Sequence, residues 1–122
     1  MPLAISLQGQ VGLVTGAGTP HGIGRSMVLA LAEAGAKIVY ACDLNISAIP
    51  CLQEEISATG STCKVEARLL DVSEEESTVS LLKEIVKKEG RFDFYLANAG
   101  FANYRYVDMR PEDVWFLQFP DI

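Results

Sequence analysis

The sequence predicts an α/β fold, a three-layer αβα arrangement around a parallel sheet of about four strands. Short apolar runs alternate with longer amphipathic stretches along the chain, which is the pattern of successive βαβ units. A cluster of glycines lies between the first apolar run and the first amphipathic stretch, where a strand must turn sharply into a helix. The 122 residues contain no repeat or linker and are expected to form one domain, residues 1–122.

The first strand and helix flank the glycine cluster. Residues 11–15 form a short apolar run that predicts a buried strand. The apolar spacing of residues 22–34 predicts a helix, and Gly35 directly after it is a typical helix end. A second strand is expected over residues 37–42, ending at Asp43.

The middle of the chain continues the alternation of helix and strand. Residues 47–59 predict a second helix, which Gly60 closes. Pro50 lies in its first turn, where a missing N–H costs little. Residues 63–70 then predict a third strand.

The third helix has the clearest start and end signals. Ser73 is a suitable N-cap, and Glu76 stands three residues later, so the pair predicts a capping box. The helix is expected to run to about Lys88, with lysines in its last turn and Gly90 after it.

A fourth strand over residues 92–97 leads into Asn98-Ala-Gly100, and residues 111–118 predict the start of one more helix. Right-handed crossovers would give the strand order 3-2-1-4. The fourth strand would then be an open edge, which predicts marginal stability, or an oligomer or partner that covers the edge.

The composition argues against several classes of function. The net charge is −6 and the sequence pI is about 4.7, so no basic patch is available for nucleic acid or for an anionic membrane. We interpret the acidity as a solubility feature. The three cysteines lack CxxC spacing, which favours reduced thiols over a metal site, and we expect a cytoplasmic protein without a secretory signal.

The informative motif is the stretch Thr-Gly-Ala-Gly-Thr-Pro-His-Gly-Ile-Gly, residues 15–24. It follows a predicted strand and opens a helix, the context in which a glycine cluster indicates dinucleotide binding. Glycines let a pyrophosphate approach the backbone, and the helix N-terminus offers free N–H groups and a positive dipole end. The alternative is a purely structural turn, which also favours glycine.

Asp43 lies at the end of the second predicted strand, nineteen residues after Gly24. In a dinucleotide fold, a carboxylate there accepts hydrogen bonds from the ribose hydroxyls and repels a 2′-phosphate. This favours NAD over NADP. The alternative is an exposed Asp that caps the next helix.

These motifs resemble the short-chain dehydrogenase/reductase family. Its Thr-Gly-x-x-x-Gly-x-Gly motif is similar to Thr15, Gly16, Gly22, Ile23 and Gly24, its adenine-contacting Asp-Val to Asp71 and Val72, and its Asn-Ala-Gly to Asn98, Ala99 and Gly100. The resemblance implies a truncated Rossmann fold that binds a nicotinamide dinucleotide, with NAD as the expected cofactor and NADP not excluded.

Two positions depart from the family pattern. The glycine loop has five residues between Gly16 and Gly22 where the family has three, with Pro20 and His21 as the extra pair. His21 is expected to face solvent or a phosphate. Asp43 falls about one residue later than the family's NAD-selecting Asp, with Cys42 near that position.

The resemblance also implies catalytic residues that the chain lacks. In the family a Ser and a Tyr-x-x-x-Lys carry the chemistry, whereas no Tyr-x-x-x-Lys occurs in this sequence. The nearest match runs from Tyr106 to Arg110 and has Arg in place of Lys, so we assign it no role. We therefore expect an oxidoreductase by lineage that is inactive alone. The alternative is a non-catalytic nucleotide-binding or interaction module.

Overall fold

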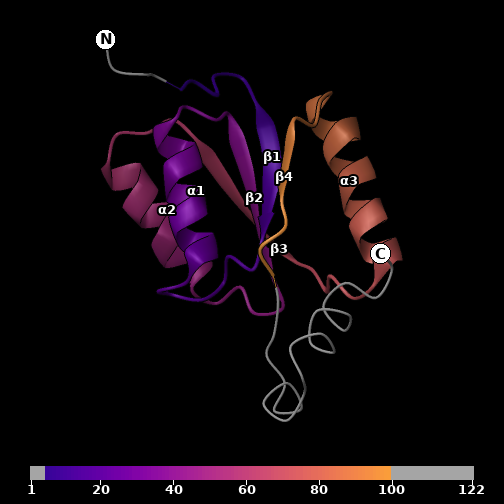
Figure 1. The fold of residues 1–122 in the computed structure, drawn as a ribbon. Helices are drawn as coiled ribbons and strands as arrows, with labels where there is room; N and C mark the ends of the chain where they lie inside the picture. Colours follow the sequence, from indigo (N-terminus) through magenta and orange to yellow (C-terminus); the bar gives the residue numbers. More distant parts are fainter. Residues whose placement is uncertain (1–4, 100–122) are drawn as a thin grey trace, which may run out of the picture.

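A computed structural model gives the structure of the protein and describes residues 5–99. It confirms the α/β class and the parallel sheet, with the strand order β3-β2-β1-β4. Helices α1 and α2 cover one face of the sheet and α3 covers the other (Figure 1). The elements are β1 (Val11–Thr15), α1 (Ile23–Glu33), β2 (Ile38–Asp43), α2 (Ile49–Ala58), β3 (Lys64–Leu69), α3 (Glu75–Glu89) and β4 (Phe94–Leu96).

Strand β1 lies between β2 and β4, and all of its residues are buried. It pairs with β2 along its whole length but with β4 only from Gly12 to Val14. A Cβ on Gly12 would lie 2.1 Å from the ring of Phe94, so glycine is required there by close approach. The ring of Phe94 thereby packs on the same face as α1 and α2.

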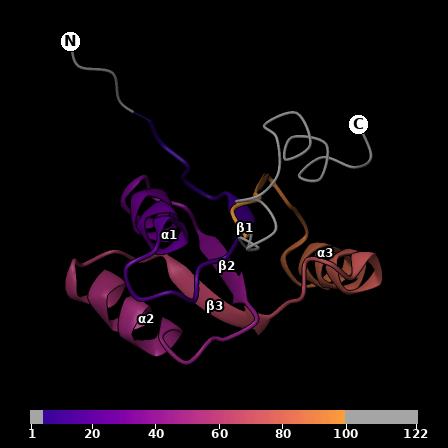
Figure 2. The same cartoon turned by 60° about the horizontal axis from the view of Figure 1, so that its bottom comes forward.

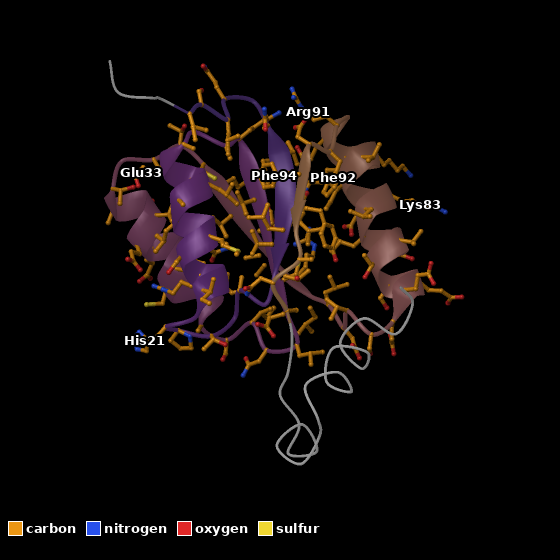
Figure 3. The ribbon with its side chains drawn as sticks, in the orientation of Figure 1. His21, Glu33, Lys83, Arg91, Phe92 and Phe94 are labelled. Carbon is orange, nitrogen blue, oxygen red and sulfur yellow. The ribbon has the colours of Figure 1, made fainter. Side chains whose placement is uncertain are left out.

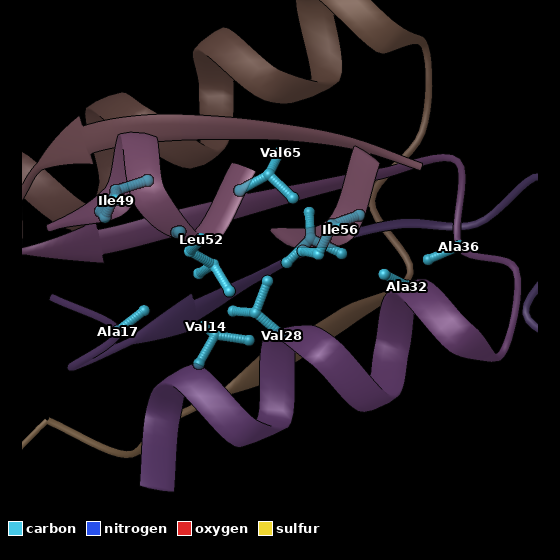
Figure 4. Packing of buried hydrophobic residues seen from close by; sticks show 11 residues of the cluster. Val14, Ala17, Val28, Ala32, Ala36, Ile49, Leu52, Ile56 and Val65 are labelled. Atoms are coloured by element: carbon cyan, nitrogen blue, oxygen red, sulfur yellow. The ribbon is translucent and has the colours of Figure 1, made fainter. Parts of the chain in front are cut away.

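The face under α1 and α2 is packed from small and branched side chains (Figure 4). Val14 and Val39 from the sheet meet Val28 of α1 and Leu52 of α2, and each of the four is fully buried. Burial of such side chains contributes about 1.5–3 kcal/mol each to folding. The alternating strand–helix pattern of the sequence is therefore explained by this shared core.

The face under α3 contains larger side chains and a polar rim. Leu13 and Tyr40 pack against Leu81 and Ile85 of α3. The Tyr40 hydroxyl donates to Oε1 of Glu89 at 3.3 Å. Burial, followed by the negative charge of Glu89, raises the pKa of Tyr40 to about 12, so the phenol stays neutral.

At the amino ends of the strands, the carboxylate of Asp93 links two neighbouring segments. Oδ2 of Asp93 accepts the backbone N–H of Val11 at 2.8 Å, which ties the segment before β4 to the start of β1. Arg91 donates to both oxygens of Asp93, from Nε at 2.8 Å and from a terminal nitrogen at 3.0 Å. The Arg91 guanidinium and then the Val11 N–H hold the pKa of Asp93 below its usual range.

The structure corrects the predicted start of the third helix. Ser73 is not the N-cap and forms no capping box with Glu76, because α3 begins at Glu75 with Glu74 as its N-cap. Oδ1 of Asp71 instead accepts the Ser73 N–H at 2.9 Å and the Ser73 hydroxyl at 2.6 Å. The Ser73 side chain is thus engaged by the preceding turn.

The other predicted boundaries are right to within a few residues. Strand β4 is the shortest, since it spans only Phe94–Leu96 of the six residues expected. Gly35 and Gly60 follow their helices with positive φ values of 91° and 84°, as expected of helix ends. The helix predicted at residues 111–118 lies outside the described residues.

Candidate nucleotide site

A cleft of about 580 Å³ lies at the carboxyl ends of the strands. Figure 2 brings this end of the molecule forward and shows the loops after β1 and β2. Every predicted site residue within the described residues except Gly24 lines it, and Gly100 lies outside them. The lining residues are Thr15, Gly16, Thr19, Gly22, Ile23, Cys42, Asp43, Leu44, Leu70, Asp71, Val72, Ser73, Asn98 and Ala99.

The glycine loop lies against two other parts of the backbone. Gly16 has φ of +74°, and a Cβ there would lie 2.9 Å from the Cα of Ala99. Gly24 lies buried beneath the loop, where a Cβ would meet the carbonyl oxygen of Gly16 at 2.2 Å. Glycine at these two positions therefore lets α1 begin directly under the loop.

Thr15 joins the glycine loop to the segment after β4. Its hydroxyl oxygen, almost fully buried, accepts the backbone N–H groups of Asn98 and Ala99 at 3.0 Å each. The side-chain amide of Asn98 donates in return to the carbonyl oxygen of Gly16 at 3.3 Å. Thr15 therefore holds the Asn98–Ala99 segment at the floor of the cleft.

The extra pair in the loop forms the middle of a β-turn. The N–H of Gly22 donates to the carbonyl oxygen of Thr19 at 3.1 Å. Pro20 then occupies the second position of the turn and Gly22 the fourth, which are favoured positions for these residues. His21 is exposed on this turn (Figure 3) and does not line the cleft. The insertion is thus accommodated on the surface without lengthening the floor of the site.

Asp43 is held at the cleft by backbone groups. Its Oδ2 accepts the N–H of Gly18 at 2.8 Å and its Oδ1 accepts the N–H of Leu44 at 2.7 Å. The alternative that Asp43 caps the next helix is wrong, because α2 begins at Ile49 and its N-cap is Ala48. Each carboxylate oxygen keeps a second lone pair for a ligand.

Asp71 stands across the cleft from the glycine loop, after β3. The Ser73 hydroxyl and then the Ser73 N–H hold the pKa of Asp71 below its usual range, so it is charged at neutral pH. Its neighbour Val72 is exposed, as is Leu44 after β2. The cleft lining therefore combines two exposed apolar side chains, Leu44 and Val72, with the carboxylates of Asp43 and Asp71.

The lining carries negative charge and, among the described residues, no cationic side chain. Arg25 in the first turn of α1 pairs with Glu55 of α2. Cys42 is buried beside Asp43, and burial raises the pKa of its thiol to about 12, so it adds no charge. A phosphate at this cleft would rely on backbone N–H groups and the α1 dipole.

Sequence reasoning missed the part that Gly18 takes in the site. Its N–H meets Asp43 only because the loop after β1 folds over the end of β2, where the Ala17 N–H also donates to the carbonyl oxygen of Cys42 at 3.1 Å. The available signal was one more glycine in the loop than the resemblance requires.

The amino-acid sequence is similar to that of known proteins. A family described as enoyl-(acyl carrier protein) reductase matches residues 16–118. Versicolorin reductase 1 of Aspergillus parasiticus is 37% identical over 109 residues, which cover 88% of this chain and 40% of that protein. The chain thus spans less than half the length of this curated relative.

Solved structures of relatives share the fold, and among them one contains NAD⁺ and another contains NADP. A crystal structure of NAD⁺-bound xylitol dehydrogenase matches with a TM-score of 0.66 and 32% identity over 78% of this chain and 35% of the other. A metagenomic short-chain oxidoreductase in complex with NADP matches with a TM-score of 0.72 and 28% identity over 88% of this chain and 47% of the other. None of the helices within residues 5–99 is long and apolar enough to cross a membrane. The chain belongs to the short-chain dehydrogenase/reductase family.

Proposed function

We propose that residues 1–122 act as one cofactor-binding unit that takes the adenosine half of a nicotinamide dinucleotide and prefers NADH to NADPH. The observation that carries the proposal is the cleft itself. Asp43 and Asp71 line it together with the glycine loop, and no cationic side chain of the described residues does so. A 2′-phosphate would meet the Asp43 carboxylate without a counter-charge, whereas a ribose hydroxyl can donate to it.

The remaining predicted residues have assigned places in this proposal. The pyrophosphate lies at the N-terminus of α1, against Gly16, Gly22 and Ile23, where backbone N–H groups and the helix dipole favour an anion. The adenine lies between the exposed side chains of Leu44 and Val72, next to Asp71. Asn98 and Ala99 form the floor toward the nicotinamide side, and Gly100, which lies outside the described residues, is proposed to bind the cofactor with them.

Titration calorimetry with NADH and NADPH tests this proposal. We expect weak binding of NADH and weaker binding of NADPH, since the Asp43 carboxylate would repel the 2′-phosphate. The far-ultraviolet circular dichroism spectrum provides the folding control. Folded protein that releases no heat with either nucleotide would refute the proposal.

We further propose that the 122-residue polypeptide does not turn over substrates by itself. A carbonyl reduction needs a proton donor at the oxygen, which contributes roughly 10²–10⁴-fold to the rate, and the sequence has no Tyr-x-x-x-Lys. Assays of NADH and NADPH oxidation with ketones and aldehydes should give no activity. Activity of the 122-residue polypeptide that Tyr106→Phe abolishes would overturn this.

Finally, we propose that the free edge of β4 takes a further strand, which the 122-residue polypeptide obtains in the cytoplasm from a second copy. Strand β4 pairs only with β1 among the described residues, and Tyr95 in it is exposed. An unpaired edge of this kind is a template for strand addition. Analytical ultracentrifugation should detect a concentration-dependent dimer, and Tyr95→Lys should weaken it. A monomer at all concentrations would refute the proposal.

A further inference from the structure

Two consecutive N–H groups of the glycine loop bind the end of β2. The Ala17 N–H donates to the carbonyl oxygen of Cys42 and the Gly18 N–H donates to Oδ2 of Asp43. The main chain of Asp43 is held as well, because its carbonyl oxygen accepts the N–H of Leu70 at 3.0 Å. Hydrogen bonds therefore join the glycine loop, Asp43 and the segment after β3.

Glycine at position 18 is required by close approach. A Cβ there would lie 2.1 Å from the carbonyl oxygen of Asn45 and 2.9 Å from both Cβ and Oδ2 of Asp43. The first of these contacts is with backbone, which cannot rotate away as a flexible side chain would. Any side chain at this position must displace the segment from Asp43 to Asn45.

We propose that Gly18 is a specificity-determining residue, which positions the Asp43 carboxylate to select the nucleotide. This rests on the proposed function, in which Asp43 receives the ribose hydroxyls and repels a 2′-phosphate. A free aspartate side chain would turn toward solvent when a phosphate approached it. Held by the N–H groups of Gly18 and Leu44, the carboxylate stays in place and discriminates.

A double-mutant cycle tests the link between the two residues. The dissociation constants of NADH and NADPH are measured for wild type, Gly18→Ala, Asp43→Ala and the double variant. Gly18→Ala should narrow the NADH preference about tenfold, on the scale of one lost discriminating contact. In the Asp43→Ala background it should leave the ratio unchanged, because the carboxylate through which it acts is gone.

Gly22→Ala is the matched control in the same loop. Its Cβ would meet the Cβ of Thr19 at 3.1 Å rather than Asp43. It should weaken both nucleotides in the same proportion, as a general disturbance of the loop would. If Gly18→Ala and Gly22→Ala changed the ratio of the NADPH and NADH dissociation constants equally, the inference would be overturned. A change in this ratio caused by Gly18→Ala in the Asp43→Ala background would also overturn it.

Asp43→Glu keeps the inference testable if Gly18→Ala fails to fold. The longer side chain retains the charge but cannot place it at the Gly18 N–H with the same geometry, so the NADH preference should narrow. An unchanged ratio would refute the inference alone. A folded wild-type chain that binds neither nucleotide would refute the proposed function and this inference with it.

Discussion

Asp43 and Asp93 lie at opposite ends of the sheet and are bound by the same kind of group. Each accepts a backbone N–H at 2.8 Å from a neighbouring segment, Gly18 for Asp43 and Val11 for Asp93. They differ in their second partner. Asp93 receives both donors of Arg91, whereas Asp43 receives the N–H of Leu44 and lies in a cleft lined by another carboxylate.

This difference separates a structural carboxylate from one available to a ligand. The guanidinium of Arg91 pairs with Asp93 within the fold and offsets its negative charge. The N–H groups around Asp43 orient its carboxylate but leave its negative charge uncompensated. We infer that the amino end of the sheet serves stability and the carboxyl end serves recognition.

The largest effect is expected from a substitution in β1, the strand that links the two ends of the sheet. Leu13 is fully buried in the central strand, between the two aspartates. Leu13→Ala should lower the free energy of unfolding by about 2–5 kcal/mol, since it removes buried methyl groups and leaves a cavity. Urea denaturation measures this. Val79→Ala on α3, where the side chain is 40% exposed, is the control and should change the free energy by less than about 0.5 kcal/mol.

Asp43→Ala should change recognition more than stability. Without the carboxylate, the gap between the NADH and NADPH binding free energies should narrow by on the order of 1–3 kcal/mol. Of the two N–H groups that it releases, that of Leu44 is exposed, so water can accept from it, and that of Gly18 is partly buried. Calorimetry gives the two affinities. A constant gap would mean that Asp43 only holds the glycine loop.

Asp93→Ala should show the opposite behaviour. The Val11 N–H loses its acceptor in a partly buried place and Arg91 loses its partner, so the urea midpoint should fall. The ratio of NADH to NADPH affinity should stay at the wild-type value. A changed ratio would break the division between the two ends of the sheet.

The smallest effect is expected in the pH dependence of stability. Because the folded pKa of Asp93 is lowered, its contribution is fully present above the unfolded value of about 3.9 and is lost as the pH falls through the folded value. The free energy of unfolding of wild type should therefore fall with acidity in this range. Asp93→Asn should flatten that part of the profile, and an unchanged slope would contradict the assignment.

Much of the fold was predictable because it depends on local patterns. Apolar runs and glycine stops gave the strands, the helices and their order. The cap of α3 was wrongly predicted because Asp71 lies two residues before Ser73 and competes for its hydroxyl. The contact between Gly18 and Asp43 joins residues 25 positions apart, and no local pattern encodes such a contact.

The two edges of the sheet have different chemistry, with a consequence for how copies of the chain assemble. Strand β3 carries Lys64, Glu66 and Arg68 on alternate positions, with ion pairs from Glu66 to both cations. Such charges oppose the addition of another strand. Strand β4 carries Phe94, Tyr95 and Leu96. If β4 pairs with a second copy, as proposed above, the charged β3 edge would limit the assembly to a closed pair about a two-fold axis and prevent growth into a filament.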